Sequence, residues 1–427
     1  MIKIYQSTEE GASVFLREGH SLNQEIVNNV QKIVEDIRVN GEEAVFAYTK
    51  RFDQAELTKA TWQVSKAEIE EAYNSVDQEF LDALSQAKEN IMGYHRKQLQ
   101  NSWWNVDEQG NITGLIYRPL DRVGLYVPGG TAAYPSSVLM TALPAIVAGV
   151  EEIIMVSPPG KDGKMNPYTL VAAQECGVTA IYKMGGAQAV AALAYGTESL
   201  APVRKIVGPG NIYVTVAKKL VYGQVDIDML AGPSEILIVA DETANPRFVA
   251  IDLLSQAEHD TLAKAVLITP SKKLAEEVQQ EVENWLGKLS RVAIARQSID
   301  NGSGIVITRD IEEAIDLAND FAPEHLELAV DNPMELLGKI KNAGAIFLGH
   351  FTPEPLGDYY AGPNHVLPTG GTGKFYSLLN VDMYLKKSSV LSYSQSGLNA
   401  AAKDVIKLAT VEGLDAHANA IRVRVQG

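Results

Sequence analysis

The segment VGLYVPGGTAAYPSSVLMTALPAIVAGVEEIIMV, residues 123–156, decides the fold class. It begins and ends with short strand-like runs, 123–127 and 152–156, and the residues between them have a helical pattern. Strand, helix and strand in this order are typical of parallel strands joined by a helix that covers one face of the sheet. The apolar stretch 138–150 contains Thr141 and Pro144 and is shorter than the roughly 20 residues that span a bilayer.

The same alternation continues on both sides of this segment, from about residue 119 to 350. Further strands are expected at 180–183, 205–207, 236–239, 265–268, 304–308, 326–330 and 345–348. Apolar residues at helical spacing predict helices at 22–39, 42–49, 65–74 and 78–95, and two short helices at 399–407 and 414–421. The sequence therefore predicts an α/β protein with small helical segments at its N- and C-terminal ends.

Composition narrows the range of functions that the chain could have. The chain has 427 residues, 46% of them hydrophobic, and a formal net charge of −16. An acidic excess disfavours a nucleic-acid partner, and the polar, acidic N-terminus does not resemble a signal peptide, so we expect a cytoplasmic protein. A single cysteine, Cys176, excludes an intrachain disulfide and a cysteine-based metal cage. We interpret Cys176 as a packing residue, and any metal must be held by nitrogen and oxygen ligands.

Glycine is concentrated in three predicted turns between a strand and a helix: 128–131, 185–188 and 208–211. Glycine allows backbone N–H groups to approach a ligand, and the N-terminus of a following helix favours phosphate. None of the three turns has the Gly-x-Gly-x-x-Gly spacing of a conventional dinucleotide site. Each turn alone is explained equally well by the geometry of a tight connection.

Scattered polar residues are candidates for a metal site. Gln256 and His259 are three residues apart in an expected helix over 246–260, so both side chains lie on one face. Asp358 lies in a segment punctuated by proline and glycine, and His417 lies near a helix start. Zinc accepts such ligands and is usually four-coordinate. Taken singly, each residue is also typical of a surface or capping position.

Glu324 and His325 are adjacent and follow Pro323 at the start of a predicted strand. A neutral histidine can take a proton from an alcohol, and a carboxylate can activate water. The alternative is a capping glutamate beside a hydrogen-bonded histidine.

Several motifs together are similar to those of one family. They are residues 123–130 (VGLYVPGG), 208–211 (GPGN), 231–235 (AGPSE), 256–259 (QAEH), 322–327 (APEHLE) and 364–369 (NHVLPT). In order and spacing they resemble the motif series of the histidinol dehydrogenase family, from about residue 20 to 425. The motifs are long and unusual, so the resemblance is specific.

The resemblance implies oxidation of L-histidinol to L-histidine through histidinal, with two NAD molecules and one Zn²⁺ per subunit, at the end of histidine biosynthesis. By motif correspondence, the zinc ligands would be Gln256, His259, Asp358 and His417, and the metal would chiefly position the substrate. Glu324 would activate water and His325 would be the general base. Other substrate contacts would be Ser234 and Glu412, while Tyr126, Gln188 and Asn211 would contact NAD.

The resemblance also implies the fold and the assembly. The family is similar to the aldehyde dehydrogenase superfamily and contains two incomplete Rossmann-like units. We expect an N-terminal segment 1–20, a first α/β domain of 21–125 with 236–380, a second Rossmann-like domain of 126–235, and a dimerisation segment 381–427. In the implied homodimer, this last segment would carry Glu412 and His417 into the partner's active site.

Two rival hypotheses remain open at this level. The first is another zinc- or NAD-linked dehydrogenase acting on a different amino alcohol, which only the substrate contacts distinguish. The second is a metal- or nucleotide-binding module without turnover, which does not account for the adjacent Glu324 and His325.

Overall fold

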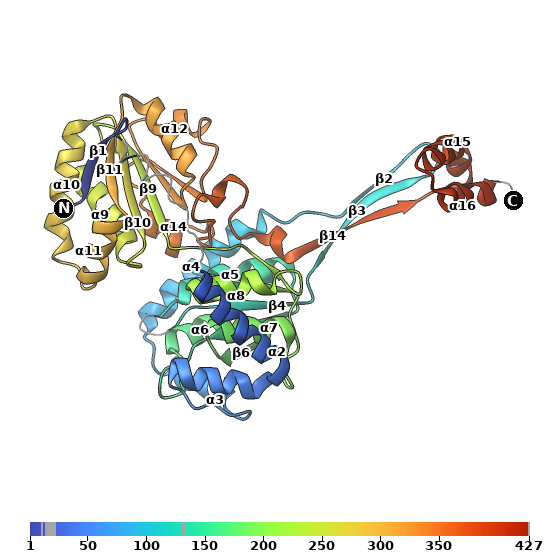
Figure 1. Ribbon diagram of the computed structural model, residues 1–427, viewed down its shortest axis with the longest axis horizontal. Coiled ribbons are helices and arrows are strands. Elements are labelled where there is room, and N and C mark those ends of the chain that lie inside the picture. The colour runs from blue at the N-terminus through green and yellow to red at the C-terminus, as the bar shows by residue number, and fades with distance from the viewer. Residues whose placement is uncertain (10–11, 13–22, 130–132, 426–427) are drawn as a thin grey trace.

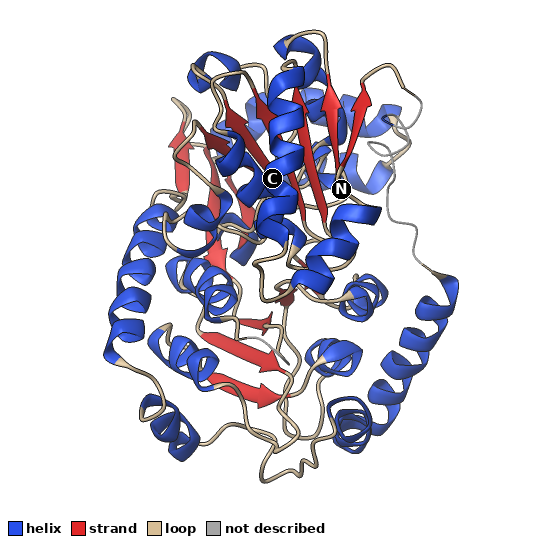
Figure 2. Cartoon of the chain, turned by 90° about the vertical axis from the view of Figure 1, so that its left-hand side faces the viewer, coloured by secondary structure: helices blue, strands red, loops and turns tan. Residues whose placement is uncertain are grey.

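The computed structural model describes residues 1–9, 12, 23–129 and 133–425. Half of the expected segment 1–20 lies outside the described residues, as do Gly130 and Thr131 of the first glycine-rich turn. Figure 1 shows two α/β units side by side and a long arm that extends away from both. In Figure 2 helices flank the strands of both sheets. Among the described residues, none of the helices combines the length and apolar character that crossing a bilayer requires.

The first unit is built on a five-stranded parallel sheet with the order β6-β5-β4-β7-β8. Its elements are β4 (Arg122–Tyr126), α5 (Pro135–Ala148), β5 (Glu152–Ser157), α6 (Pro167–Glu175), β6 (Ala180–Lys183), α7 (Gly186–Tyr195), β7 (Lys205–Val207), α8 (Ile212–Val221) and β8 (Asp226–Ile227). The strands are largely buried because helices cover both faces, as apolar runs in a parallel sheet predict.

The second unit has a six-stranded parallel sheet with the order β1-β11-β10-β9-β12-β13. It contains β1 (Lys3–Gln6), β9 (Glu235–Ala240), α9 (Pro246–Ala257), β10 (Lys264–Thr269), α10 (Lys272–Leu286), α11 (Val292–Asn301), β11 (Gly304–Ile307), α12 (Ile311–Phe321), β12 (His325–Ala329), α13 (Pro333–Leu337), β13 (Ala345–Leu348) and α14 (Glu354–Tyr359). The predicted α/β class with two Rossmann-like units is confirmed. The strand β1 at one edge was not expected.

Within residues 23–129 as described, three helices precede the first sheet: α2 (Gln24–Asp53), α3 (Lys66–Tyr73) and α4 (Gln78–Arg96). The two helices expected at 22–39 and 42–49 form one element that is kinked at Gly41, where φ is +54°. Helix α2 packs on α7 and α8, α3 on α6, and α4 on α5. These contacts differ from the expected grouping of residues 21–125 with 236–380. We therefore propose that α2 to α4 belong to the five-stranded unit, because they cover the apolar faces of its helices.

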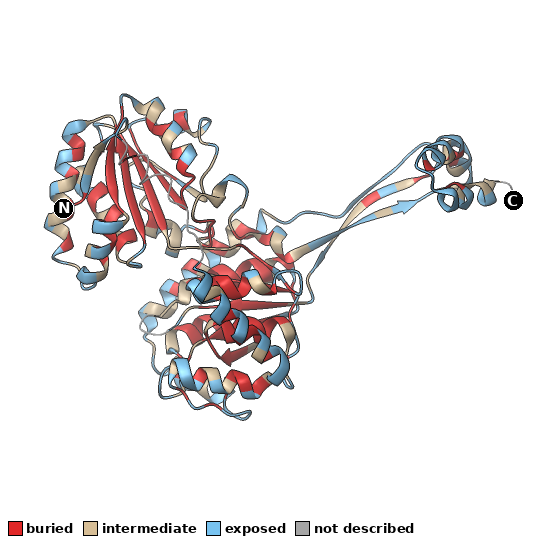
Figure 3. Cartoon of the chain, in the orientation of Figure 1, coloured by how far each residue is buried: buried red, intermediate tan, exposed pale blue. Residues whose placement is uncertain are grey.

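The arm is formed by segments far apart in the chain. Strands β2 (Trp103–Val106), β3 (Ile112–Pro119) and β14 (Leu385–Ser392) make a three-stranded antiparallel sheet, and helices α15 (Gln395–Val411) and α16 (Asp415–Val425) lie at its end. Two short 3₁₀ helices precede β14, Thr372–Lys374 and Val381–Tyr384. Much of the arm is exposed (Figure 3), including Trp104 at 66% and Leu391 at 69%. Such apolar exposure on a thin extension is typical of a surface that another chain covers.

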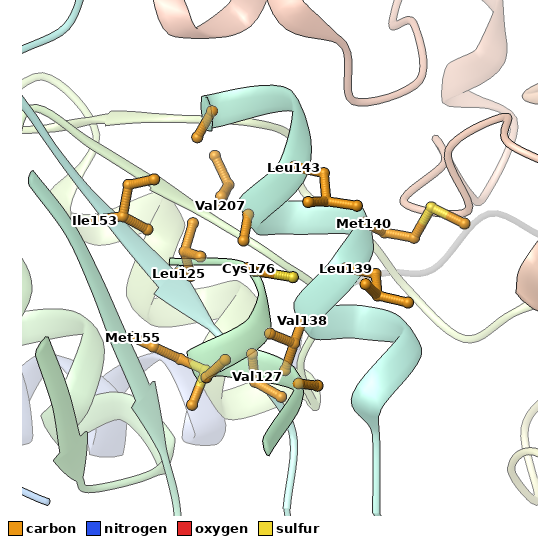
Figure 4. Close-up of a cluster of buried hydrophobic side chains, with 14 of the residues drawn as sticks. Leu125, Val127, Val138, Leu139, Met140, Leu143, Ile153, Met155, Cys176 and Val207 are labelled. Carbon is orange, nitrogen blue, oxygen red and sulfur yellow. The ribbon is translucent and has the colours of Figure 1, made fainter. Parts of the chain in front are cut away.

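The core of the five-stranded unit contains Cys176. Its side chain is buried among Leu125, Val138 and Ile153 between the sheet and helix α5 (Figure 4). Burial raises the pKa of the thiol to about 12. Since the thiolate is the reactive form, the interpretation of Cys176 as a packing residue is confirmed.

Candidate active site

Glu324 and His325 lie at the junction between α12 and β12. The helix ends at Ala322, a buried residue in the left-handed region with φ +53°, and Pro323 prevents a further turn. The next residue, Glu324, accepts a hydrogen bond from the N–H of Glu235 (2.9 Å), and His325 Nδ1 lies 3.1 Å from the Glu235 carbonyl oxygen. Both side chains are therefore held against the start of β9.

Their surroundings shift both pKa values upward. Burial raises the pKa of Glu324 to about 8, partly opposed by the charge of His325. Burial alone would lower the pKa of His325, but the carboxylates of Glu324, Glu354 and Asp358 outweigh it and hold this pKa well above the ordinary value. The Nε2 atom of His325 is buried without a hydrogen-bond partner and lies 3.7 Å from Asp358 Oδ1. One imidazole nitrogen is thus anchored and the other is available for proton transfer.

Gln256 and His259 come from the end of α9. The helix ends at Ala257, earlier than expected, and His259 lies in the following turn, where its N–H donates to the Gln256 carbonyl (3.1 Å). The two side chains still lie together, with Gln256 Nε2 3.4 Å from His259 Nδ1. Gln256 is 0% exposed and its Oε1 has no hydrogen-bond partner. An unpaired buried amide oxygen is costly unless a ligand meets it.

Asp358 and Glu354 lie one turn apart on α14, a short helix in the segment punctuated by proline and glycine. The ligand atoms of His259, Glu354 and Asp358 all lie within 4.8 Å of one another. Together with Gln256 Oε1 they offer the nitrogen and oxygen donors that zinc accepts, so the residues present fit this metal. Sequence reasoning missed Glu354, although its spacing of four residues from Asp358 could have indicated it.

His365 is a further residue that sequence reasoning did not single out as part of the site. Its Nδ1 lies 3.2 Å from the Asp358 carbonyl oxygen and 3.8 Å from Asp358 Oδ2. Burial lowers the pKa of His365, which favours the neutral ring. The side chain therefore supports the position of Asp358.

Ser234 immediately precedes Glu235 at the amino end of β9, so its backbone adjoins the group around His325. Because β9 and β12 are paired neighbours, this group lies at the amino ends of two adjacent strands. Ligands in open α/β sheets more often bind at the carboxyl ends. In this unit the turn after α9 and the helix α14 both lie near the amino ends of these strands, and their side chains complete the group there.

Glu412 and His417 do not join this group within the chain. Glu412 caps the end of α15 and His417 lies in the first turn of α16, both exposed at the far end of the arm (Figure 1). The structure thus brings together Gln256, His259, Glu324, His325 and Asp358, with the backbone of Ser234 next in the chain to Glu235, and leaves Glu412 and His417 apart from them.

The candidate NAD contacts occupy the other sheet. Tyr126 ends β4, Gln188 lies in the first turn of α7, and Asn211 caps α8. The Tyr126 hydroxyl accepts a hydrogen bond from the N–H of Gly186 (3.0 Å), and Gln188 Oε1 is buried without a partner. The sheet order changes direction between β4 and β7, and the carboxyl ends of strands at such a point commonly bind nucleotides.

Comparison with known proteins agrees with these features. The model of the family described as histidinol dehydrogenase matches residues 16–425. The chain is 59% identical to a histidinol dehydrogenase of Heliobacterium mobile, covering 93% of each chain, and 54% identical to one of Clostridium acetobutylicum, covering 99% of this chain and 96% of that one. The crystal structure of histidinol dehydrogenase from Elizabethkingia anophelis is similar, with a TM-score of 0.95, 38% identity, and coverage of 100% and 98%.

Proposed function

The chain belongs to the histidinol dehydrogenase family of NAD-dependent oxidoreductases, and we propose that it converts L-histidinol to L-histidine through histidinal, with two NAD molecules and one zinc ion per subunit. The observation that carries this proposal is the meeting of two buried bases, Glu324 and His325, with the candidate metal donors around Asp358, of which His259 is exposed. A simple binding module has no use for the two bases.

Zinc would be held by Gln256, His259 and Asp358 of one chain together with His417 of the partner subunit. When bound, zinc would fix the imidazole and the amine of the substrate. The unpaired Gln256 Oε1 supports this assignment, because it is a buried oxygen donor on the amide whose Nε2 lies 3.4 Å from His259 Nδ1. Ser234 and Glu412 would complete the substrate contacts.

His325 would act at Nε2 as the general base. It would take the proton of the substrate hydroxyl in the first oxidation and the proton of the aldehyde hydrate in the second. The contact between Nδ1 and the Glu235 carbonyl oxygen, at 3.1 Å, holds the ring in one orientation for both proton transfers. Glu324 would take a proton from water as that water attacks the aldehyde carbon, and its buried carboxylate is held in place by the Glu235 N–H.

NAD, when bound, would accept the hydride in each oxidation. Tyr126, Gln188 and Asn211 would contact it at the carboxyl ends of β4 and β7. The buried, unpaired Gln188 Oε1 and the N-terminus of α8 support this location. The dependence on NAD also supports a cytoplasmic location.

The enzyme would be a homodimer with shared active sites. The arm carries Glu412 and His417 far from the other site residues of its own chain, and its exposed tryptophan and leucine side chains require a cover. In a closed two-fold dimer each arm would reach the other subunit's site, which would then be incomplete in a monomer.

The decisive experiment is the NADH yield per histidinol, with and without a chelator. We expect two NADH per histidinol, loss of activity on chelation and recovery on adding zinc. One NADH per alcohol, or no turnover of histidinol, would favour a dehydrogenase for another amino alcohol. Zinc or NAD binding without any turnover would favour the binding module.

A further inference from the structure

Asp53, the last residue of α2, carries a carboxylate that the fold does not use. The negative end of a helix dipole disfavours an acidic side chain at this position. Its Oδ2 atom is buried without a hydrogen-bond partner, and Asp53 forms no ion pair with any residue that the structure describes. Burial raises the pKa of this carboxyl to about 6. An unpaired buried acceptor destabilises the free protein, and a ligand that donates a hydrogen bond to it removes this cost.

The packing of α2 on α7 places Asp53 beside the start of α7. Directly after the kink in α2, Glu42 accepts a hydrogen bond from the Ser199 N–H (2.6 Å), just beyond the end of α7. The ten residues of α7 rise about 15 Å and the residues from Glu42 to Asp53 about 16 Å, so the two helices match in length. At the other end, burial and the nearby charge of Asp53 both raise the pKa of Tyr126, whose hydroxyl accepts from the Gly186 N–H.

A second buried oxygen without a partner lies at the same end of α7. Gln188 is 1% exposed, and its Oε1 atom has no hydrogen-bond partner. Its side chain folds back over Gly186, since a Cβ at Gly186 would lie 2.8 Å from this oxygen. With Asp53 Oδ2, this region of the proposed NAD site has two acceptors that lack donors. The neighbouring hydroxyl groups of a ribose are donors of the kind that these oxygens require.

The position that usually supplies a carboxylate to the ribose has none here. Conventional Rossmann units bind the 2′-hydroxyl of the adenosine ribose with an acidic residue that follows the glycine-rich turn by about 20 residues. In this unit the carboxyl end of β5 is followed by Ser-Pro-Pro-Gly at 157–160. Glu152 lies at the opposite, amino end of β5 and pairs with Arg122 (3.0 Å). Asp53 brings a carboxylate to this side of the sheet from another element.

We propose that Asp53 accepts a hydrogen bond from the 2′-hydroxyl of the adenosine ribose of NAD and thereby makes the enzyme prefer NAD to NADP. The inference rests on the proposed NAD site and deepens it. NADP has a phosphate in place of this hydroxyl hydrogen. The phosphate cannot make the same donation, and its negative charge is repelled by the carboxylate.

The test is cofactor binding by the full-length protein in the absence of histidinol. Fluorescence titration measures the affinities for NADH and NADPH of wild type, D53N and E43Q. We expect D53N to bind NADH about 10-fold more weakly, as for the loss of a hydrogen bond to a charged group, and to bind NADPH as well as wild type or better. E43Q is the matched control, because Glu43 is an exposed acid on the same helix, and its affinities should not change.

An analogue of NADH with 2′-deoxyadenosine tests the same contact without a variant. Wild type should bind this analogue about 10-fold more weakly than NADH, and D53N should bind the two more nearly equally. If D53N does not fold by circular dichroism, the comparison in wild type alone decides.

Three results would overturn the inference: equal NADH affinity of D53N and wild type, an unchanged ratio of NADH to NADPH affinity in D53N, or equal binding of NADH and its deoxy analogue by wild type. These results leave the proposed function standing. Wild type that binds no NADH would contradict both, whereas NADH binding without histidinol turnover would contradict only the proposed substrate.

Discussion

At the scale of single residues, the proposed chemistry depends on two bases with different environments and different tasks. Glu324 is buried and held by one backbone N–H, whereas His325 is anchored at Nδ1 and unpaired at Nε2. Only the second oxidation consumes water. A change at Glu324 should therefore separate the two oxidations.

We expect Glu324→Gln to slow oxidation of histidinal more than oxidation of histidinol, by about 10² to 10⁴-fold for the aldehyde step, since the amide cannot accept a proton from water. Single-turnover NADH formation from each substrate measures this. Glu335→Gln, an exposed position, is the control. An equal loss in both steps would count against the water-activating role.

The raised pKa of Glu324 predicts a pH dependence. Below its pKa of about 8 the carboxyl is protonated and cannot act as a base, so the aldehyde step should accelerate as pH rises through about 8. The raised pKa of His325 acts in the same direction. The pH profile of histidinal oxidation tests this, and a rate that declines over the same range would contradict it.

At the scale of elements, the connection between β7 and α8 shows how the fold shapes the turn at which we propose that NAD binds. Gly208 has φ +114°, and an added Cβ would lie 2.1 Å from the Tyr126 carbonyl oxygen, so only glycine fits. The N–H of Gly208 donates to Asp228 (2.7 Å), and Lys218 donates to the Gly208 carbonyl (3.0 Å). Lys218 and Asp228 also form a buried ion pair.

Removing one partner of that ion pair should lower the stability of the folded protein. We expect Lys218→Met to lower the free energy of unfolding by about 3–5 kcal/mol, because Asp228 is left buried and uncompensated. The double variant K218M/D228N should recover part of this loss. Urea unfolding measures the effect, with the exposed Lys219→Met as control. In the folded variant the KM for NAD should rise more than the KM for histidinol; equal changes would show that the pair has no specific effect on the turn.

At the scale of the whole molecule, the two units carry different parts of the proposed reaction. The segment 360–384, which leads from α14 of the six-stranded unit to β14 of the arm, is tied to the five-stranded unit: Asn364 Nδ2 donates to the Met140 carbonyl (2.7 Å), and the Tyr384 hydroxyl donates to the Thr141 carbonyl (2.7 Å). Strand β14 of the arm starts directly after Tyr384. Its position is therefore set by the same unit that would bind NAD.

Shared sites predict complementation between chains. A mixture of H417A and H325A chains, dissociated and reassembled, should recover about a quarter of wild-type activity, because half of the dimers are mixed and each has one intact site. Each variant alone should be inactive, and a mixture without reassembly is the control. If the mixture stays inactive while mixed dimers are detected, the sites are not shared.

The amino-acid sequence by itself determined the α/β class and the positions of most strands, such as 123–127 and 152–156. Burial on both sheet faces requires continuous apolar runs, and this requirement is visible locally. It also determined the candidate site residues through long motifs, while Gln256 or Asp358 alone carried little information.

Tertiary structure decided which residues meet. The packing of α2 to α4 on the five-stranded unit, the joining of Glu354 with His259, and the separation of His417 on the arm all depend on contacts between distant segments. Local periodicity records which face of an element is buried, but not the element that buries it. Strand pairing and helix packing make that choice, and for this reason the metal-binding group became apparent only in the folded chain.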